Sequence, residues 1–253
     1  MNNNKITVII VARMGSSRFP GKTLADLHGK PMLERLVERL QCSKYVQNII
    51  VATTDLEEDS AIEDWCTKNN FYCYRGSSKD VLGRMNEAGK YFNCSTIIEI
   101  LGDNPLVHSS LVDAAVNLYH NNDLEYVGTL TKEYLKIDSM QKYFPIGIRV
   151  KVYSLGTLRK CNKLANSNYF REHGTSFIAE NLDKFRFGFI DASGKFSNCF
   201  RPDLTFAVNQ KKNLDLIRRI YKKCYDFNPN FGIDAAIQAY NEQPKWHDLM
   251  GNE

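Results

Sequence analysis

Residues 6–22 read ITVIIVARMGSSRFPGK, an apolar run followed directly by a loop with three cations and two glycines. The run Ile6–Val11 is apolar or β-branched throughout, which is typical of a strand covered on both faces. In an open α/β sheet, the loop that follows such a strand borders the ligand crevice. The sequence therefore predicts a buried strand, and it places a candidate binding site in the loop Arg13–Lys22, called the basic loop below.

The first 130 residues alternate between short β-branched runs and amphipathic helical patterns, which is the signature of βαβ units around a mainly parallel sheet. After residue 130 the pattern loosens, and the polar stretch 131–143 has no clear period. We expect strands at residues 6–11, 48–53, 71–74, 96–101, 146–153, 185–190 and 204–208. We expect helices at about residues 31–40, 61–66, 80–92 with Ser78 as the cap, 109–119, 154–164, 171–180 and 214–224.

Length and composition limit the class of protein. The 253 residues fit a single domain, 1–253, and 33 basic against 29 acidic residues give a net charge of +4. This balance does not indicate a partner among nucleic acids or membranes. No apolar run approaches the roughly 18 residues of a spanning helix, and we expect no secretory signal. Seven scattered cysteines without a C-x-x-C pair favour reduced thiols in the cytoplasm.

The composition of the basic loop suits a phosphate. Glycine lets the backbone approach an anion, arginine donates forked hydrogen bonds, and lysine adds a point charge. The spacing does not match a P-loop, because Gly15 lies one position too early for Gly21-Lys22-Thr23, and there is no G-x-G-x-x-G after the strand. An exposed basic turn is the alternative interpretation.

Several motifs together resemble those of the cytidylyltransferases that activate acidic sugars. The first is Arg13-x-Gly15-x-x-Arg18-x-x-Gly21-Lys22, followed by residues 29–33, GKPML. Further matches are VATTD at 51–55, RGS at 75–77, DVLGR at 80–84, GDNPL at 102–106 and REH at 171–173. The sequence is most similar to the branch named for spore coat polysaccharide protein F, which is related to the CMP-Kdo and CMP-sialic acid synthetases. The resemblance spans about residues 5–225.

This resemblance implies a Rossmann-like, three-layer α/β/α nucleotidyltransferase fold of the GT-A type, with a mixed, mainly parallel sheet. It also implies a small β insertion at residues 131–153 that acts as the arm of a homodimer. The implied reaction transfers CMP from CTP to an acidic sugar or a related acceptor for a surface polysaccharide, with pyrophosphate as the leaving group.

The resemblance also assigns roles to particular residues. Arg13, Lys22 and Asp103 would be catalytic, and Asp103 with Asn209 would hold Mg²⁺, which prefers oxygen ligands. The implied contacts with the nucleotide are Ala12, Arg13, Gly15, Ser16, Ser17, Arg18, Lys22, Thr53, Asp80, Arg84 and Gly102.

Purely structural roles are the alternative for some of these residues. Asp103 lies in Gly-Asp-Asn-Pro, a sequence that favours a turn on its own. For Arg84 the alternative is a surface ion pair with Asp80, one helical turn away. For Glu57-Glu58-Asp59 it is a solvated helix start. His173 has two readings, a proton carrier or a histidine of a helix surface or core.

Two other functions stay open. A glycosyltransferase is disfavoured because the chain has no Asp-x-Asp. A nucleotide-binding homologue with impaired catalysis is suggested by two departures from the family pattern. Asn209 stands where an aspartate is usual, and Glu99 stands where an arginine is frequent.

Overall fold

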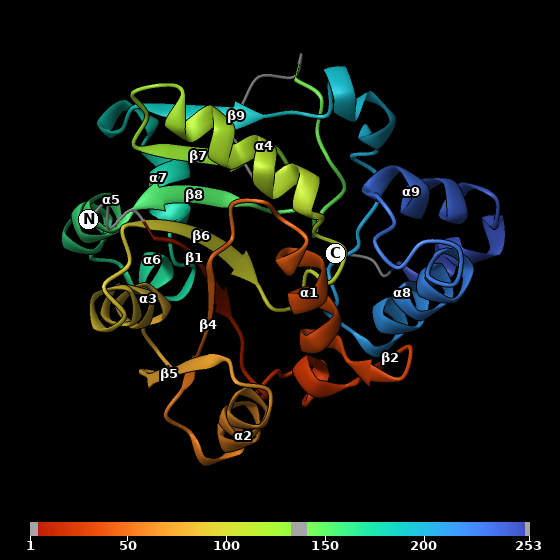
Figure 1. Ribbon diagram of the computed structural model, residues 1–253, viewed down its shortest axis with the longest axis horizontal. Coiled ribbons are helices and arrows are strands. Elements are labelled where there is room, and N and C mark those ends of the chain that lie inside the picture. Colours follow the sequence, from red (N-terminus) through yellow and green to blue (C-terminus); the bar gives the residue numbers. More distant parts are fainter. Residues whose placement is uncertain (1–4, 133–140, 251–253) are drawn as a thin grey trace.

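The computed structural model describes residues 5–132 and 141–250. Its main sheet has seven strands in the order β5-β4-β1-β6-β8-β7-β9 (Figure 1). Neighbouring strands are parallel except that β8 runs antiparallel to β6 and β7, so the sheet is mixed and mainly parallel, as expected. The strands are β1 Ile6–Val11, β4 Asn48–Thr54, β5 Tyr72–Gly76, β6 Thr96–Leu101, β7 Tyr126–Thr129, β8 Lys151–Ser154 and β9 Phe187–Ile190, with a separate hairpin of β2 Asp26–Leu27 and β3 Lys30–Pro31.

Helices cover both faces of this sheet. In Figure 1, α4 crosses in front of β7 and β8, and α7 lies behind them. The α-helices are α1 Met32–Gln41, α2 Ser60–Lys68, α3 Val81–Tyr91, α4 Ser109–His120, α5 Leu155–Leu164, α6 Asn168–Glu172, α7 Ser176–Glu180, α8 Lys211–Cys224 and α9 Ile233–Asn241. The short 3₁₀ helices are η1 Lys22–Leu24, η2 Glu57–Asp59, η3 Leu182–Lys184, η4 Gly194–Cys199 and η5 Pro244–Leu249.

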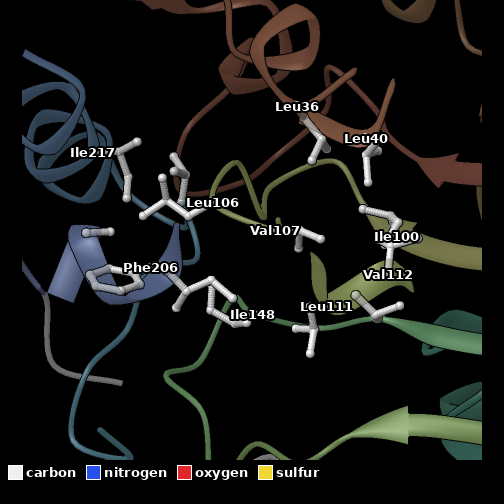
Figure 2. Packing of buried hydrophobic residues seen from close by; sticks show 14 of the residues in the cluster. Leu36, Leu40, Ile100, Leu106, Val107, Leu111, Val112, Ile148, Phe206 and Ile217 are labelled. Carbon is white, nitrogen blue, oxygen red and sulfur yellow. The ribbon is translucent and has the colours of Figure 1, made fainter. Parts of the chain in front are cut away.

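The β1 strand joins the two halves of the core. Its successive side chains point to opposite faces, so Val8 and Ile10 belong to the cluster with α1, α4, α8 and α9, while Ile9 belongs to the cluster with α3 and α5. Figure 2 shows part of the larger cluster, including Leu40 of α1 and Val112 of α4. The predicted buried strand and the three-layer arrangement are confirmed.

The segment expected as an insertion, residues 131–153, differs from the prediction at its end. Residues 151–153 belong to β8, which pairs with β6 in the middle of the sheet, and Phe144, Ile148 and Val150 are fully buried. This part is sheet and core because its apolar side chains alternate with polar ones and fill the space beside β6. Residues 133–140 lie outside the described residues, and the dimer arm stays a prediction.

Other expected elements are corrected by tertiary contacts. The expected helix 171–180 is split into α6 and α7, since Gly174 between them has a φ of +59°. Residues 204–208 are extended but form one isolated bridge, between Thr205 and Ile146, rather than a strand. The cap of α3 is Asp80, whose carboxylate accepts from the Gly83 amide at 2.8 Å, and not Ser78.

Across the described ranges 5–132 and 141–250, none of the helices is long and apolar enough to cross a membrane.

Gly147 lies where two extended segments cross, and it provides a test of this packing. Its φ is +88°, and a Cβ would lie 2.3 Å from the Ala207 nitrogen. We expect Gly147→Ala to lower the free energy of unfolding by about 3 kcal/mol or more, because backbone strain and overpacking add. Gly194→Ala is the control, since its φ is +52° with nothing within 4 Å, and it should cost about 1 kcal/mol. Equal losses in urea denaturation would contradict the close crossing.

Candidate active site

A cleft of about 690 Å³ opens at the carboxyl ends of β1 and β6. One side is the basic loop, and the other side is formed by α6, α7 and the start of α3. Two predicted site residues, Thr53 and Asp80, do not line it. The predicted site residues that do are Ala12, Arg13, Gly15, Ser16, Ser17, Arg18, Lys22, Arg84, Gly102, Asp103 and Asn209.

Local contacts hold the basic loop in shape. Gly21, with a φ of +77°, donates its amide to the Met14 carbonyl at 2.9 Å, and the Thr23 hydroxyl donates to the Arg13 carbonyl at 2.7 Å. These bonds close the loop on itself. Arg13, Arg18 and Lys22 of this loop line the cleft.

Asp59 anchors the same loop through its buried carboxylate, and this role differs from the one expected from the sequence. One carboxylate oxygen accepts from the Met14 amide, and the other accepts from the Thr54 hydroxyl. Asp59 is fully buried, in contrast to the solvated helix start that was expected. The sequence Glu57-Glu58-Asp59 does not indicate that its third carboxylate is buried.

Three guanidinium groups line the cleft without a carboxylate partner in the described part of the chain. Arg13 and Arg18 are exposed, and their side chains make no hydrogen bond or ion pair there. Arg84 is only 2% exposed, donates to the Ser77 carbonyl at 2.6 Å, and has an Nε without an acceptor among the described residues. Burial and the nearby Arg13 lower the pKa of Arg84. A buried cation needs an anion, so the site is prepared for an anionic ligand.

Asp103 and Asn209 both line the cleft, and their role as metal ligands stays a prediction. The Asp103 carboxylate contacts Lys22 Nζ at 2.8 Å through one oxygen. The Val208 amide donates to the Asp103 carbonyl at 2.9 Å, which brings Asn209 close. The Asn209 side chain has no hydrogen bond within the described ranges. One carboxylate and one amide oxygen fit Mg²⁺, which is commonly held by one or two protein ligands together with phosphates and water.

Thr53 and Asp80 have structural positions. Thr53 is fully buried in β4, and its hydroxyl lacks a partner among the residues described. Asp80 caps α3 and pairs with Arg171 of α6, not with Arg84. Direct contact of either residue with the nucleotide stays a prediction.

Glu99 is the centre of a buried polar network that the sequence did not indicate. Its carboxylate contacts Lys151 Nζ at 2.9 Å and accepts from Tyr153 at 2.7 Å and from Thr175 at 2.5 Å. Burial alone would raise the pKa of Glu99, but the Lys151 charge and the hydrogen bonds outweigh it and lower the pKa. The network ties Thr175, between α6 and α7, to the sheet.

The wall opposite the basic loop comes from α6 and α7. Tyr169, Glu172, His173, Ser176 and Glu180 line the cleft there. The His173 ring lies 4.5 Å from the Tyr169 ring. This places His173 in the cleft, consistent with the first of its two interpretations, although the contact itself is a packing contact.

The anchoring of the basic loop by Asp59 can be tested directly. We expect Asp59→Ala to lower the free energy of unfolding by about 1–3 kcal/mol, because two donors lose their acceptor. The Met14 amide should exchange its hydrogen at least about tenfold faster. Glu57→Ala, an exposed neighbour, is the control. Unchanged exchange at Met14 would show that Asp59 does not hold the loop.

The Glu99–Lys151 pair makes a pH-dependent prediction. Lys151→Met leaves a buried carboxylate without its counterion and should cost about 3–5 kcal/mol at pH 7. The pKa of Glu99 is low in the native protein and would rise in this variant, so protonation at lower pH relieves the cost. The deficit in urea denaturation should therefore shrink from pH 7 to pH 4.5. Adding Glu99→Gln should recover most of it, and a deficit that is equal at both pH values would refute this account.

Comparisons with known proteins agree with this geometry. A family model described as Cytidylyltransferase matches residues 7–229. The uncharacterized protein MJ1063 of Methanocaldococcus jannaschii is 38% identical over 251 residues, which cover 94% of this chain and 98% of that protein. The spore coat polysaccharide biosynthesis protein SpsF of Bacillus subtilis is 29% identical over 246 residues, covering 95% and 96%.

A solved structure shares the fold over its whole length. The structure of a cytidylyltransferase from Leptospira borgpetersenii is similar with a TM-score of 0.81 and 26% identity, covering 98% of both chains. The expected nucleotidyltransferase fold is therefore confirmed. Because the family match runs from the first strand to beyond α8, the chain belongs to the cytidylyltransferase family.

Proposed function

We propose that this protein transfers CMP from CTP to an acidic sugar or a related acceptor, with release of pyrophosphate, in the synthesis of a surface polysaccharide. The observation that carries the proposal is the set of three guanidinium groups, Arg13, Arg18 and Arg84, that face one cleft without a carboxylate partner in the described chain. A triphosphate supplies the anion that they lack. Membership of the cytidylyltransferase family supports CTP as its source.

The cleft offers a place for each reactant. The basic loop and Arg84 would bind the triphosphate, and the α6–α7 wall would bind the acceptor. A hydroxyl oxygen of the acceptor attacks the α-phosphorus in line and releases its proton to solvent. The new P–O bond forms, and the bond to the bridging oxygen breaks as pyrophosphate leaves. Catalysis of this kind comes mainly from positioning and charge neutralisation. Mg²⁺, held by Asp103 and Asn209, would neutralise charge on the phosphates.

The part of the cleft that would bind the acceptor suits a polar ligand with hydroxyl groups. Lys151 has three N–H donors, of which two are used by Glu99 and Thr175. Its charge is already balanced, so it offers a hydrogen bond rather than a net positive charge. Similarity to SpsF supports a role in polysaccharide synthesis.

We also propose a cytoplasmic homodimer. The seven cysteines are all free thiols, which suits a reducing compartment. A monomeric mass by light scattering would reject the dimer.

The test combines nucleotide binding with turnover. CTP with Mg²⁺ should raise the melting temperature more than UTP, ATP or GTP does, because ligands bound only by the native state stabilise it. Acidic sugars, with 3-deoxy-manno-octulosonate among them, are then screened for release of pyrophosphate. Arg84→Lys should weaken CTP binding by about tenfold, since lysine lacks the fork of donors, whereas the exposed Arg159→Lys should not change it.

Two results would reject the proposal. Absence of stabilisation by any nucleotide would exclude the triphosphate site. CTP binding without pyrophosphate release from any acceptor would favour the impaired homologue that Asn209 suggests, and failure of Asn209→Asp to create turnover would strengthen that alternative.

A further inference from the structure

The Lys22 ammonium group bridges the two segments that carry the expected metal ligands. Its Nζ lies 2.8 Å from Asp103 Oδ2 and 2.8 Å from the carbonyl oxygen of Val208, the residue before Asn209. The side chains of Lys22 and Asp103 are 13% and 27% exposed. The ammonium is therefore held by a carboxylate and a carbonyl in a partly buried position.

Lys22 differs in this respect from the other cations of the basic loop. Arg13 and Arg18 make no ion pair with the residues that the structure describes, whereas Lys22 already has one. The Lys22 backbone is fixed at the start of η1, directly after Gly21. Its long, flexible side chain is the part that can move between two acceptors.

Lys22 and a divalent cation would compete for the Asp103 carboxylate on electrostatic grounds. A divalent cation on Asp103 would lie within a few ångströms of the ammonium group, and like charges at such distances repel strongly where solvent is limited. The metal must therefore displace Lys22 or bind weakly. A triphosphate in the cleft would offer Lys22 a more negative partner.

We infer that Lys22 is the resident counterion of Asp103 in the nucleotide-free protein and that it keeps divalent metal off this carboxylate until a triphosphate draws the ammonium away. The inference rests on the proposed function, because it takes the triphosphate as the competing anion. Lys22 then has a role before the phosphate binds, and the nucleotide and Asp103 compete for its ammonium group.

The first test uses Mn²⁺ alone, without nucleotide. Binding of Mn²⁺ is measured by electron paramagnetic resonance for the wild type, Lys22→Met and the control Lys68→Met, which removes an exposed lysine on α2. We expect Lys22→Met to bind Mn²⁺ about tenfold more tightly, within the usual range of coupling between sites. Lys68→Met should match the wild type. Adding Asp103→Asn to Lys22→Met should remove the gain.

Equal Mn²⁺ affinity in Lys22→Met and the wild type would overturn the inference, whether or not the protein binds CTP. If Lys22→Met does not fold, Lys22→Gln replaces it, with the native state checked by near-ultraviolet circular dichroism. This arm contains no nucleotide, so its outcome is separate from that of the proposed function.

The second test uses CTP in EDTA, without metal. Asp103→Asn should bind CTP about tenfold more tightly than the wild type, because Lys22 no longer has to leave a carboxylate. The gain should be absent when Asp103→Asn is made in a Lys22→Met background, as a double-mutant cycle requires for a coupled pair. A gain that persists there reflects simple repulsion between Asp103 and phosphate and would overturn the inference. Failure of every variant to bind CTP would instead reject the proposed function.

Discussion

The burial of β1 on both faces is the constraint on which the rest of the structure depends. Parallel pairing with β4 and β6 satisfies its backbone, and helices cover the alternating side chains on each side. Charged side chains are excluded from such a strand, and Thr7 is the one polar residue in β1, so the first charged side chain after the strand begins is Arg13, just beyond its end. Because β6 ends at the same edge, the basic loop and Asp103 meet there. The cleft is a consequence of this shared edge.

Buried charges in this protein divide into those that are matched by the fold and those that are not. Arg39 is buried, yet it donates to the carbonyls of Val107 and Phe231 at 3.1 and 3.0 Å and lies over the Phe231 ring. Glu99 and Lys151 match each other. Arg84 is just as buried but has one carbonyl acceptor and no ion pair in the described ranges. Arg39 also lacks an ion pair in the described ranges, and its Nη1 has no acceptor there. It differs from Arg84 in having three carbonyl acceptors and the Phe231 ring around it. Arg84 lines the cleft, so it is the buried cation that a ligand can complete.

Sequence patterns were reliable where one periodicity dominated. The strand 6–11 was predicted to the residue, and the helices α5 and α8 lie where their apolar spacing placed them. Patterns misled where a single contact decided the outcome. The helix expected at 171–180 breaks at Gly174, and the strand expected at 146–153 joins the sheet only from Lys151, as β8. The strand β7 and the helix α9 gave no pattern strong enough to predict.

The sequence by itself determined the α/β class and the position of the basic loop, because these depend on local composition and on spacing along the chain, and its motifs already resembled those of the family. Tertiary structure alone decided which charges meet. Asp59, expected in solvent, holds the loop from inside, and Glu99 of β6 pairs with Lys151 on the neighbouring strand β8 at a separation of 52 residues. Lys22 reaches Asp103 and Val208 at separations of 81 and 186 residues. Pairing at such separations depends on strand order and burial, and one-dimensional spacing carries no information about either.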